Sequence, residues 1–215
     1  KGGSGGTIVA FATFFAIEER GNVLPEELRM NKALLTATAM AAIFAVPAFA
    51  AVPSSGLNTG ERVSPFHPMH VSGPLANSTN CFPCTFQNRP QAQVWINGDS
   101  PANAAMIAKA LDNAMSTHSR AEFKAMIVWI TNPGSEEAAK GNAKRFVEAN
   151  GLKNVAVAVL PNNSSAVRDY KINLSGDVKN TAFVYKNWTV TNKMVNVSGQ
   201  AGVNALNTAI GAAVR

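Results

Sequence analysis

Cys81-Phe82-Pro83-Cys84 precedes an apolar run, Ala92-Gln93-Val94-Trp95-Ile96, and this order determines which fold and chemistry to expect. The two cysteines are the only ones in 215 residues. A Cys-x-x-Cys pair among alternating strands and helices indicates dithiol redox chemistry. In this chain the pair comes before the first buried strand rather than after it. Whether the pair is catalytic depends on that order.

Strand and helix patterns alternate after this run. Apolar stretches predict strands over about 91–97, 123–131, 155–160, 181–185 and 190–197. Apolar residues at helical spacing predict helices over about 101–117, 135–150 and 164–170, and a last helix with its stripe on Val203, Leu206, Ile210 and Ala213. Such alternation predicts an α/β fold with a mostly parallel sheet, to which the last two strands add an antiparallel hairpin.

Residues 30–50 have the pattern of a secretory signal peptide. Met30-Asn31-Lys32 is a short basic start, an uncharged apolar stretch follows, and Pro47-Ala48-Phe49-Ala50 ends in an Ala-x-Ala site. The alternative is an uncleaved membrane anchor, because residues 33–52 are nearly long enough to span a bilayer. The proline and the small residues favour cleavage. We therefore expect an extracytoplasmic chain, periplasmic or secreted, in which a disulfide can persist.

The other N-terminal segments are not expected to belong to the domain. Residues 1–29 begin with a linker-like Lys-Gly-Gly-Ser-Gly-Gly, and we interpret them as a non-native or over-called extension. Residues 51–66 mix proline and glycine with Ser, Asn and Thr, which predicts an extended tail or linker. The folded domain is expected over residues 67–215.

The charge distribution argues against a nucleic-acid partner. The formal net charge is +6, and its basic residues are scattered without a run of four or more. A nucleic-acid footprint would gather them on one stripe, so a solvated surface is the simpler interpretation. No stable membrane insertion is expected once the signal peptide is cleaved. The oligomeric state does not follow from the sequence.

Two segments resemble the thioredoxin-like superfamily. Arg89-Pro90-Gln91-Ala92-Gln93-Val94-Trp95-Ile96 is similar to the first core strand of redoxins. Asn180-Thr181-Ala182-Phe183-Val184-Tyr185-Lys186-Asn187-Trp188-Thr189-Val190 resembles the strand and hairpin that follow the family's active-site proline. The resemblance covers about residues 67–214 and extends to secreted redoxins, the peroxiredoxins and the cytochrome-maturation thiol reductases. It implies a thioredoxin-like three-layer fold with a mixed central sheet, a closing β-hairpin and a C-terminal helix.

The chain departs from this family at both halves of the usual active site. Thioredoxins and peroxiredoxins carry their reactive cysteine after the first core strand, where this chain has Asn97-Gly98-Asp99-Ser100. Asn180 stands where the family has a cis-proline beside the dithiol. Since a non-proline cis bond costs about 3–4 kcal/mol, we expect a trans bond at Asn180.

Cys81 and Cys84 are the candidate dithiol. They are spaced so that their sulfurs can meet in a tight turn, and Arg89 is the nearest cation in sequence that could stabilise a thiolate. By analogy with the family, Cys81 would attack a protein or small-molecule disulfide and Cys84 would resolve the mixed disulfide. The alternative is a redox-inactive binding or structural module in which the disulfide only stabilises the loop, as a static staple. Because a disulfide that closes so short a loop removes little entropy from the unfolded chain, a purely stabilising role is the weaker interpretation.

Metal and cofactor sites find less support in the sequence. One Cys-x-x-Cys supplies only two zinc ligands, and haem attachment would need a histidine where Thr85 stands. His67 and His70, with Met69 between them, could join the cysteines in a periplasmic copper-handling site. Alternation along a strand would place the two histidines on opposite faces, which argues against such a site. We expect no cofactor.

Overall fold

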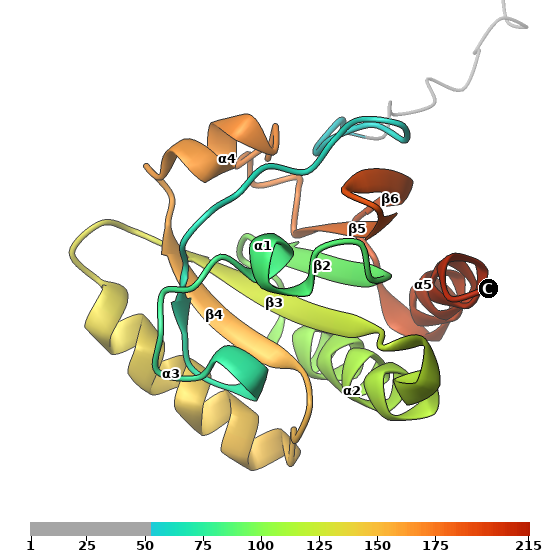
Figure 1. The fold of residues 1–215 in the computed structure, drawn as a ribbon. Helices are drawn as coiled ribbons and strands as arrows, with labels where there is room; N and C mark the ends of the chain where they lie inside the picture. The colour runs from blue at the N-terminus through green and yellow to red at the C-terminus, as the bar shows by residue number, and fades with distance from the viewer. Residues whose placement is uncertain (1–52) are drawn as a thin grey trace, which may run out of the picture. The chain divides into compact units, whose positions relative to one another are not determined.

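The structure, a computed structural model, describes residues 53–215 (Figure 1). The predicted extension over 1–29 and the predicted signal peptide over 30–50 lie outside these residues. In chain order the elements are β1 (Met69–His70), the 3-10 helix η2 (Gly73–Leu75), α1 (Phe82–Phe86), β2 (Gln91–Ile96), α2 (Pro101–Thr117), the 3-10 helix η3 (Ser119–Ala121), β3 (Lys124–Thr131), α3 (Glu136–Asn150), β4 (Ala156–Pro161), α4 (Ser165–Asp169), β5 (Asn180–Lys186), β6 (Thr189–Val195) and α5 (Gly199–Ala213). No helix between residues 53 and 215 has both the length and the hydropathy to cross a bilayer.

The strands form one mixed sheet in the order β1-β4-β3-β2-β5-β6. The three central strands β2, β3 and β4 are parallel to one another. The hairpin β5–β6 is antiparallel and adds to β2, while β1 is an antiparallel edge beside β4. This confirms the predicted mixed sheet with a closing hairpin.

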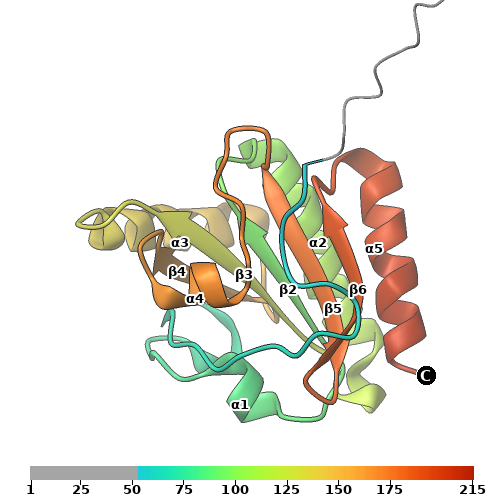
Figure 2. The ribbon, with the colours of Figure 1, turned by 90° about the horizontal axis from the view of Figure 1, so that it is seen from above.

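Helices cover both faces of the sheet, as predicted, and the two faces differ in kind (Figures 1 and 2). The three long helices α2, α3 and α5 pack on one face, where their buried apolar residues form one core cluster with the strands. The other face is covered by the short helices α1 and α4 together with the segment that precedes β1. Its cluster is rich in aromatic side chains, among them Phe66, Trp95 and Tyr170.

Local capping signals explain where the long helices begin and end. Helix α2 begins at Pro101, and the Ser100 hydroxyl accepts the Asn103 N–H at 3.2 Å. Ser135 occupies the N-cap of α3, although its side chain makes no capping hydrogen bond. Gly151 ends α3 in the left-handed conformation, with φ of 62°.

The prediction of a linker over 51–66 is wrong for the described residues 53–66. This segment is extended, but Leu57, Val63 and Phe66 are buried in the aromatic core cluster. Gly56, with φ of 87°, lies so close to the sheet that a Cβ there would come within 2.6 Å of the Phe183 ring. The proline and glycine content correctly indicated irregular backbone, but backbone conformation does not determine whether a segment packs.

Candidate functional site

The two cysteines form a disulfide at the start of α1. Cys81 is the N-cap residue, Pro83 lies in the first turn, and Cys84 follows it. The Cys84 backbone N–H donates a hydrogen bond to Sγ of Cys81 at 3.2 Å. We predicted a tight turn here, and the structure shows that it is the first turn of a helix, because proline is favourable at the first helical positions and Sγ satisfies a free N–H group.

The two cysteines differ in accessibility. Cys81 is only 6% exposed, and its carbonyl accepts hydrogen bonds from the Thr85 N–H at 3.0 Å and the Thr85 hydroxyl at 2.9 Å. Cys84 is half-buried. Cys84 is therefore the more accessible of the two residues, whereas the family resemblance predicts Cys81 as the attacking thiol.

Aromatic packing anchors α1 to the sheet. Phe82 is fully buried, and its ring meets that of Phe86 edge-on with centroids 4.7 Å apart. The ammonium group of Lys124 lies 5.7 Å from the centroid of the Phe86 ring. The disulfide thus belongs to a helix that is part of the core rather than to a mobile flap.

The structure brings His67 and His70 to the loop before the cysteines. Nδ1 of His67 lies 3.0 Å from the Thr79 carbonyl, and Nε2 of His70 lies 3.0 Å from the Asn80 carbonyl. A carbonyl oxygen only accepts, so both nitrogens must donate. His67 is exposed, whereas His70 is 3% exposed, and burial lowers the pKa of its imidazole.

These contacts give the histidines a different role from the predicted copper site. The ring nitrogens that face the loop donate to carbonyl groups, and the cysteines are bound to each other. Between residues 53 and 215, no three His, Cys, Asp or Glu side chains lie close enough to hold a metal ion together. The histidines therefore support the backbone that leads into Cys81.

Arg89, the predicted thiolate stabiliser, is paired with a carboxylate. Its Nη2 donates to Oε1 of Glu122 at 3.2 Å, and its Nε lies 3.1 Å from Oε2. The hydrogen bond from Arg89 lowers the pKa of the Glu122 carboxyl. The charge that we predicted for a thiolate is therefore balanced by Glu122.

A polar cluster occupies the place where thioredoxins carry their dithiol. Oδ1 of Asp99 accepts the Ser100 N–H at 2.7 Å. Oδ2 of Asp99 accepts from the Asn103 amide at 2.8 Å and from the Asn180 amide at 2.6 Å. This Asp99–Asn180 cluster joins the turn after β2 to the start of β5.

Asn180 is the centre of this cluster. It is 1% exposed, its amide nitrogen also donates to the Val197 carbonyl at 2.9 Å, and its Oδ1 accepts the Val197 N–H at 2.8 Å. No peptide bond within the described residues is cis, so the trans bond predicted at Asn180 is confirmed for this structure. This cluster was not predicted from the sequence, although Asp99 beside the N-cap residue Ser100 was a local signal for it.

The cysteine pair and the Asp99–Asn180 cluster belong to different ends of β2. Helix α1 leads into the start of β2, where the Gln91 amide donates to the Gln87 carbonyl at 3.0 Å. Asn180 pairs with Ile96, the last residue of β2. Figure 2 shows α1 near one end of the sheet and the first turn of α2 at the other. The structure therefore does not bring the cysteines to the usual thioredoxin site.

Comparisons with known proteins agree with this fold. No protein-family model matches the chain, and no curated protein matches it in sequence. A protein assigned as a thiol:disulfide interchange protein DsbE, from Chlorobium tepidum, is similar with a TM-score of 0.56 and 17% identity, over 74% of this chain and 99% of that one. A protein assigned as a protein disulfide isomerase, from Bacteroides thetaiotaomicron, has a TM-score of 0.56 and 10% identity, over 75% and 94%.

Peroxiredoxins are also among the similar structures. A PrxQ mutant from Xylella fastidiosa has a TM-score of 0.52 and 11% identity, over 75% of this chain and all of that one (100%). The sheet order, the closing hairpin and the C-terminal helix agree with these similarities. The chain therefore has a thioredoxin-like fold, with its cysteine pair on a helix before the first core strand.

Proposed function

We propose that this protein exchanges thiols and disulfides with protein or small-molecule partners through the Cys81–Cys84 pair. One observation carries the proposal: the disulfide has a half-buried cysteine that a partner can reach, and a buried sulfur that accepts a backbone N–H. Proteins assigned to thiol:disulfide interchange are among those that share the fold, which supports the proposal without identifying a substrate.

Exchange begins at Cys84. A partner thiolate attacks Sγ of Cys84, a mixed disulfide forms, and the bond to Cys81 breaks so that Cys81 leaves as a thiolate. The hydrogen bond from the Cys84 N–H stabilises the negative charge on Cys81, and a leaving thiol of lower pKa leaves faster. A second thiolate of the partner then attacks the partner's own sulfur in the mixed disulfide and releases Cys84 as a thiolate. The partner is oxidised to a disulfide and this protein is reduced to a dithiol.

In the reductive direction the same steps run backwards. Cys84 would attack a partner disulfide, and Cys81 would resolve the mixed disulfide. We therefore propose Cys84 as the attacking thiol, in place of the Cys81 expected by analogy, because Cys84 is the more accessible residue.

We also propose that the protein works outside the cytoplasm. The signal-peptide pattern over residues 30–50 supports this location, and an oxidising compartment is where a disulfide such as Cys81–Cys84 persists. The mass of the protein recovered from its native host tests this part, because cleavage after Ala50 would leave a chain that begins at Ala51. Recovery of a membrane-bound chain that retains residues 30–50 would favour the uncleaved anchor instead.

A binding or structural module is the second candidate. The observation in its favour is the burial of Cys81 and Phe82, which makes the disulfide part of a core-packed helix. In this case the disulfide stays oxidised, and the protein acts by binding a partner through its surface or by a structural role.

Insulin reduction in the presence of dithiothreitol separates the two candidates. We expect catalysis by the wild-type full chain and none by Cys84→Ser or Cys81→Ser. With glutathione disulfide, Cys81→Ser should form a mixed disulfide through Cys84 faster than Cys84→Ser forms one through Cys81. Equal insulin reduction by the wild-type chain and by both variants would exclude a dithiol mechanism and leave the structural module.

A further inference from the structure

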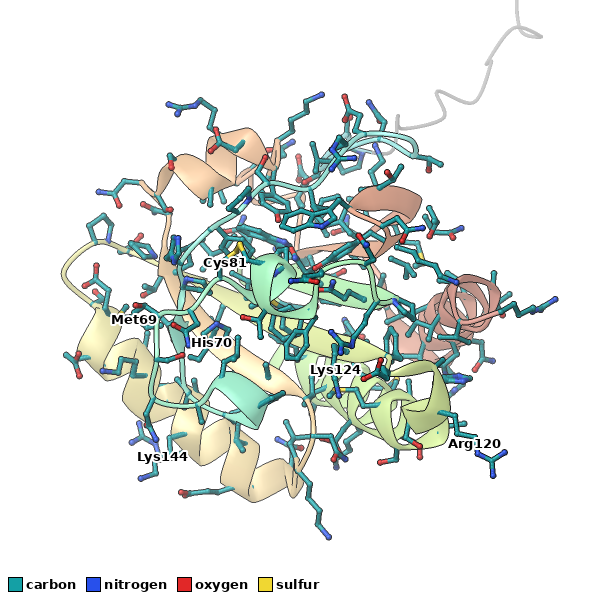
Figure 3. The ribbon with its side chains drawn as sticks, viewed as in Figure 1. Met69, His70, Cys81, Arg120, Lys124 and Lys144 are labelled. Carbon is teal, nitrogen blue, oxygen red and sulfur yellow. A yellow bond between two sulfur atoms is a disulfide. The ribbon has the colours of Figure 1, made fainter. Side chains whose placement is uncertain are left out.

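His70 contacts the loop that leads into Cys81, and both residues are labelled in Figure 3. We infer that His70 is a positioning residue for thiol–disulfide exchange, because its side chain holds the residue before Cys81 and the residue after it. This inference rests on the proposed function of the Cys81–Cys84 pair. It assigns a role in the reaction to a residue that does not itself exchange electrons or bonds.

One imidazole ring contacts both neighbours of Cys81. Its Nε2–H donates to the Asn80 carbonyl at 3.0 Å. Its face stacks against the Phe82 ring, with centroids 6.2 Å apart and planes inclined by 25°. Asn80 and Phe82 are directly before and after Cys81 in the chain, so the ring constrains Cys81 from both sides.

The backbone of His70 ties the same loop to the sheet. The His70 N–H donates to the Ser78 carbonyl at 2.9 Å, and the His70 carbonyl accepts the Asn77 N–H at 3.0 Å. His70 itself belongs to β1 and pairs with Ala158 of β4. Main chain and side chain of one residue therefore connect the cysteine loop to a strand that pairs with β4 in the sheet.

The ring is held in one neutral form. Because the Asn80 carbonyl needs a donor, the proton lies on Nε2 and Nδ1 keeps its lone pair. Nδ1 is buried, and among the described residues no group hydrogen-bonds to it. Within residues 53–215, the ring therefore makes one hydrogen bond, the bond to the Asn80 carbonyl. A substitution at His70 can remove this bond alone.

This arrangement matters most in the reduced protein. Once the disulfide is open, the backbone still keeps the two cysteines three residues apart, but only non-covalent contacts keep Sγ of Cys81 oriented toward Cys84. A reacting group held in place behaves as if it were highly concentrated, which favours ring closure over reaction with an external thiol. His70 therefore shifts the equilibrium of the pair toward the intramolecular disulfide.

Two substitutions separate the donor from the ring. His70→Phe keeps an aromatic ring against Phe82 and removes the donor, whereas His70→Gln keeps an amide donor of similar reach and removes the ring. His67→Ala is the matched control, because His67 makes a similar bond to the neighbouring Thr79 carbonyl from an exposed position. All variants are made in the full chain and checked for cooperative unfolding.

The measurement is the equilibrium between dithiol and disulfide in mixtures of reduced and oxidised glutathione, quantified by alkylation and mass spectrometry. Loss of one buried hydrogen bond is expected to lower the equilibrium constant for Cys81–Cys84 disulfide formation about tenfold in His70→Phe. We expect His70→Gln to stay within about threefold of wild type and His67→Ala to match it. A folded His70→Phe protein with the wild-type constant would overturn the inference, and so would a tenfold loss in the control His67→Ala.

The same experiment distinguishes failure of the inference from failure of the proposed function. If the folded wild-type pair does not exchange with glutathione at all, the proposed function fails, and the positioning role fails with it. If the wild-type pair exchanges and reduces insulin while His70→Phe behaves identically, only the positioning role of His70 fails.

Discussion

The start of α1 and the turn between β2 and α2 are two polar sites at different ends of β2. They differ in which groups satisfy their hydrogen-bond donors. At α1, one backbone N–H group, that of Cys84, donates to Sγ of Cys81, in a disulfide with one partly exposed cysteine. At the turn, the carboxylate of Asp99 and the buried amide of Asn180 satisfy each other and the surrounding backbone. The first site has one partly exposed cysteine, whereas the polar groups of the second site are paired by hydrogen bonds.

This difference shows that a thioredoxin-like fold does not determine where its cysteine pair lies. In thioredoxins the dithiol follows the end of β2. In this chain, hydrogen bonds at that end connect the β2–α2 turn to β5 and to the loop before α5. The cysteines have a helical turn of their own, supported by aromatic side chains on the sheet face opposite the long helices. Function lies in such sites rather than in the fold.

Removal of the Phe82 side chain is the strongest test that α1 is integral to the core. Phe82→Ala should lower the free energy of unfolding by about 3–5 kcal/mol, because the fully buried ring leaves a cavity against Phe86 and His70. Urea denaturation measures the loss, with the 38% exposed Met106→Ala as control. A loss no larger than that of the control would mean that α1 is loosely attached, and the contrast between the two sites would need another basis.

The Asp99–Asn180 cluster is tested by Asn180→Ala. This change leaves the Val197 N–H and carbonyl and one oxygen of Asp99 with fewer partners, so we expect a loss of about 1–3 kcal/mol in the free energy of unfolding. Exchange at Cys84 should remain at the wild-type rate. Asn204→Ala, on the exposed face of α5, is the control. Loss of exchange in a folded Asn180→Ala protein would show that the two sites are coupled.

The pH dependence of the free energy of unfolding tests whether His70 is buried in its neutral form. Burial lowers its pKa below the unfolded value of 6.5, so the unfolded chain binds the proton more tightly than the folded chain. The stability from neutral His70 should therefore be fully present above about pH 6.5 and decline as the pH falls toward the folded pKa. Unfolding by urea at several values between about pH 7.5 and 5.5 measures the decline, above the range in which carboxyl groups titrate. His70→Gln should lack this part of the decline, and an identical slope in both proteins would contradict the assignment.

Arg89 should give the smallest effect. Since its guanidinium is paired with Glu122 at the surface, Arg89→Ala is expected to change the rate of Cys84 with glutathione disulfide by less than about fivefold. Arg120→Ala removes the same charge from an exposed position in η3 and is the control (Figure 3). A much larger effect of Arg89→Ala than of Arg120→Ala would restore the role that the sequence suggested for Arg89, that of stabilising a thiolate.

Much of the fold could be predicted, because its signals are local. The apolar run before Asn97, the cap and proline at Ser100-Pro101 and the glycine at 151 set element boundaries within a few residues. The trans bond at Asn180 followed from the cost of a non-proline cis bond. The candidate cysteines and their displacement from the usual site could also be read from their order along the chain.

The rest of the site depended on contacts between distant residues. The resemblance suggested Cys81 as the attacking thiol, but the depth of a side chain is set by what packs over it, and Cys84 is the more exposed residue. Arg89 is near the cysteines in sequence, yet the fold brings Glu122 to it. His67 and His70 were chosen as metal ligands for their side-chain chemistry, whereas their partners are backbone carbonyls of a returning loop.

The sequence by itself determined the alternation of strands and helices and the position of the cysteines before the first core strand. These follow from periodicity, capping and order, which act over a few residues. Only the tertiary structure decided that residues 53–66 cover the sheet, that Asp99 and Asn180 pair at its usual site, and that His70 contacts both neighbours of Cys81. Each of these depends on side chains and backbone groups that are separated in the chain and meet only when the sheet has formed.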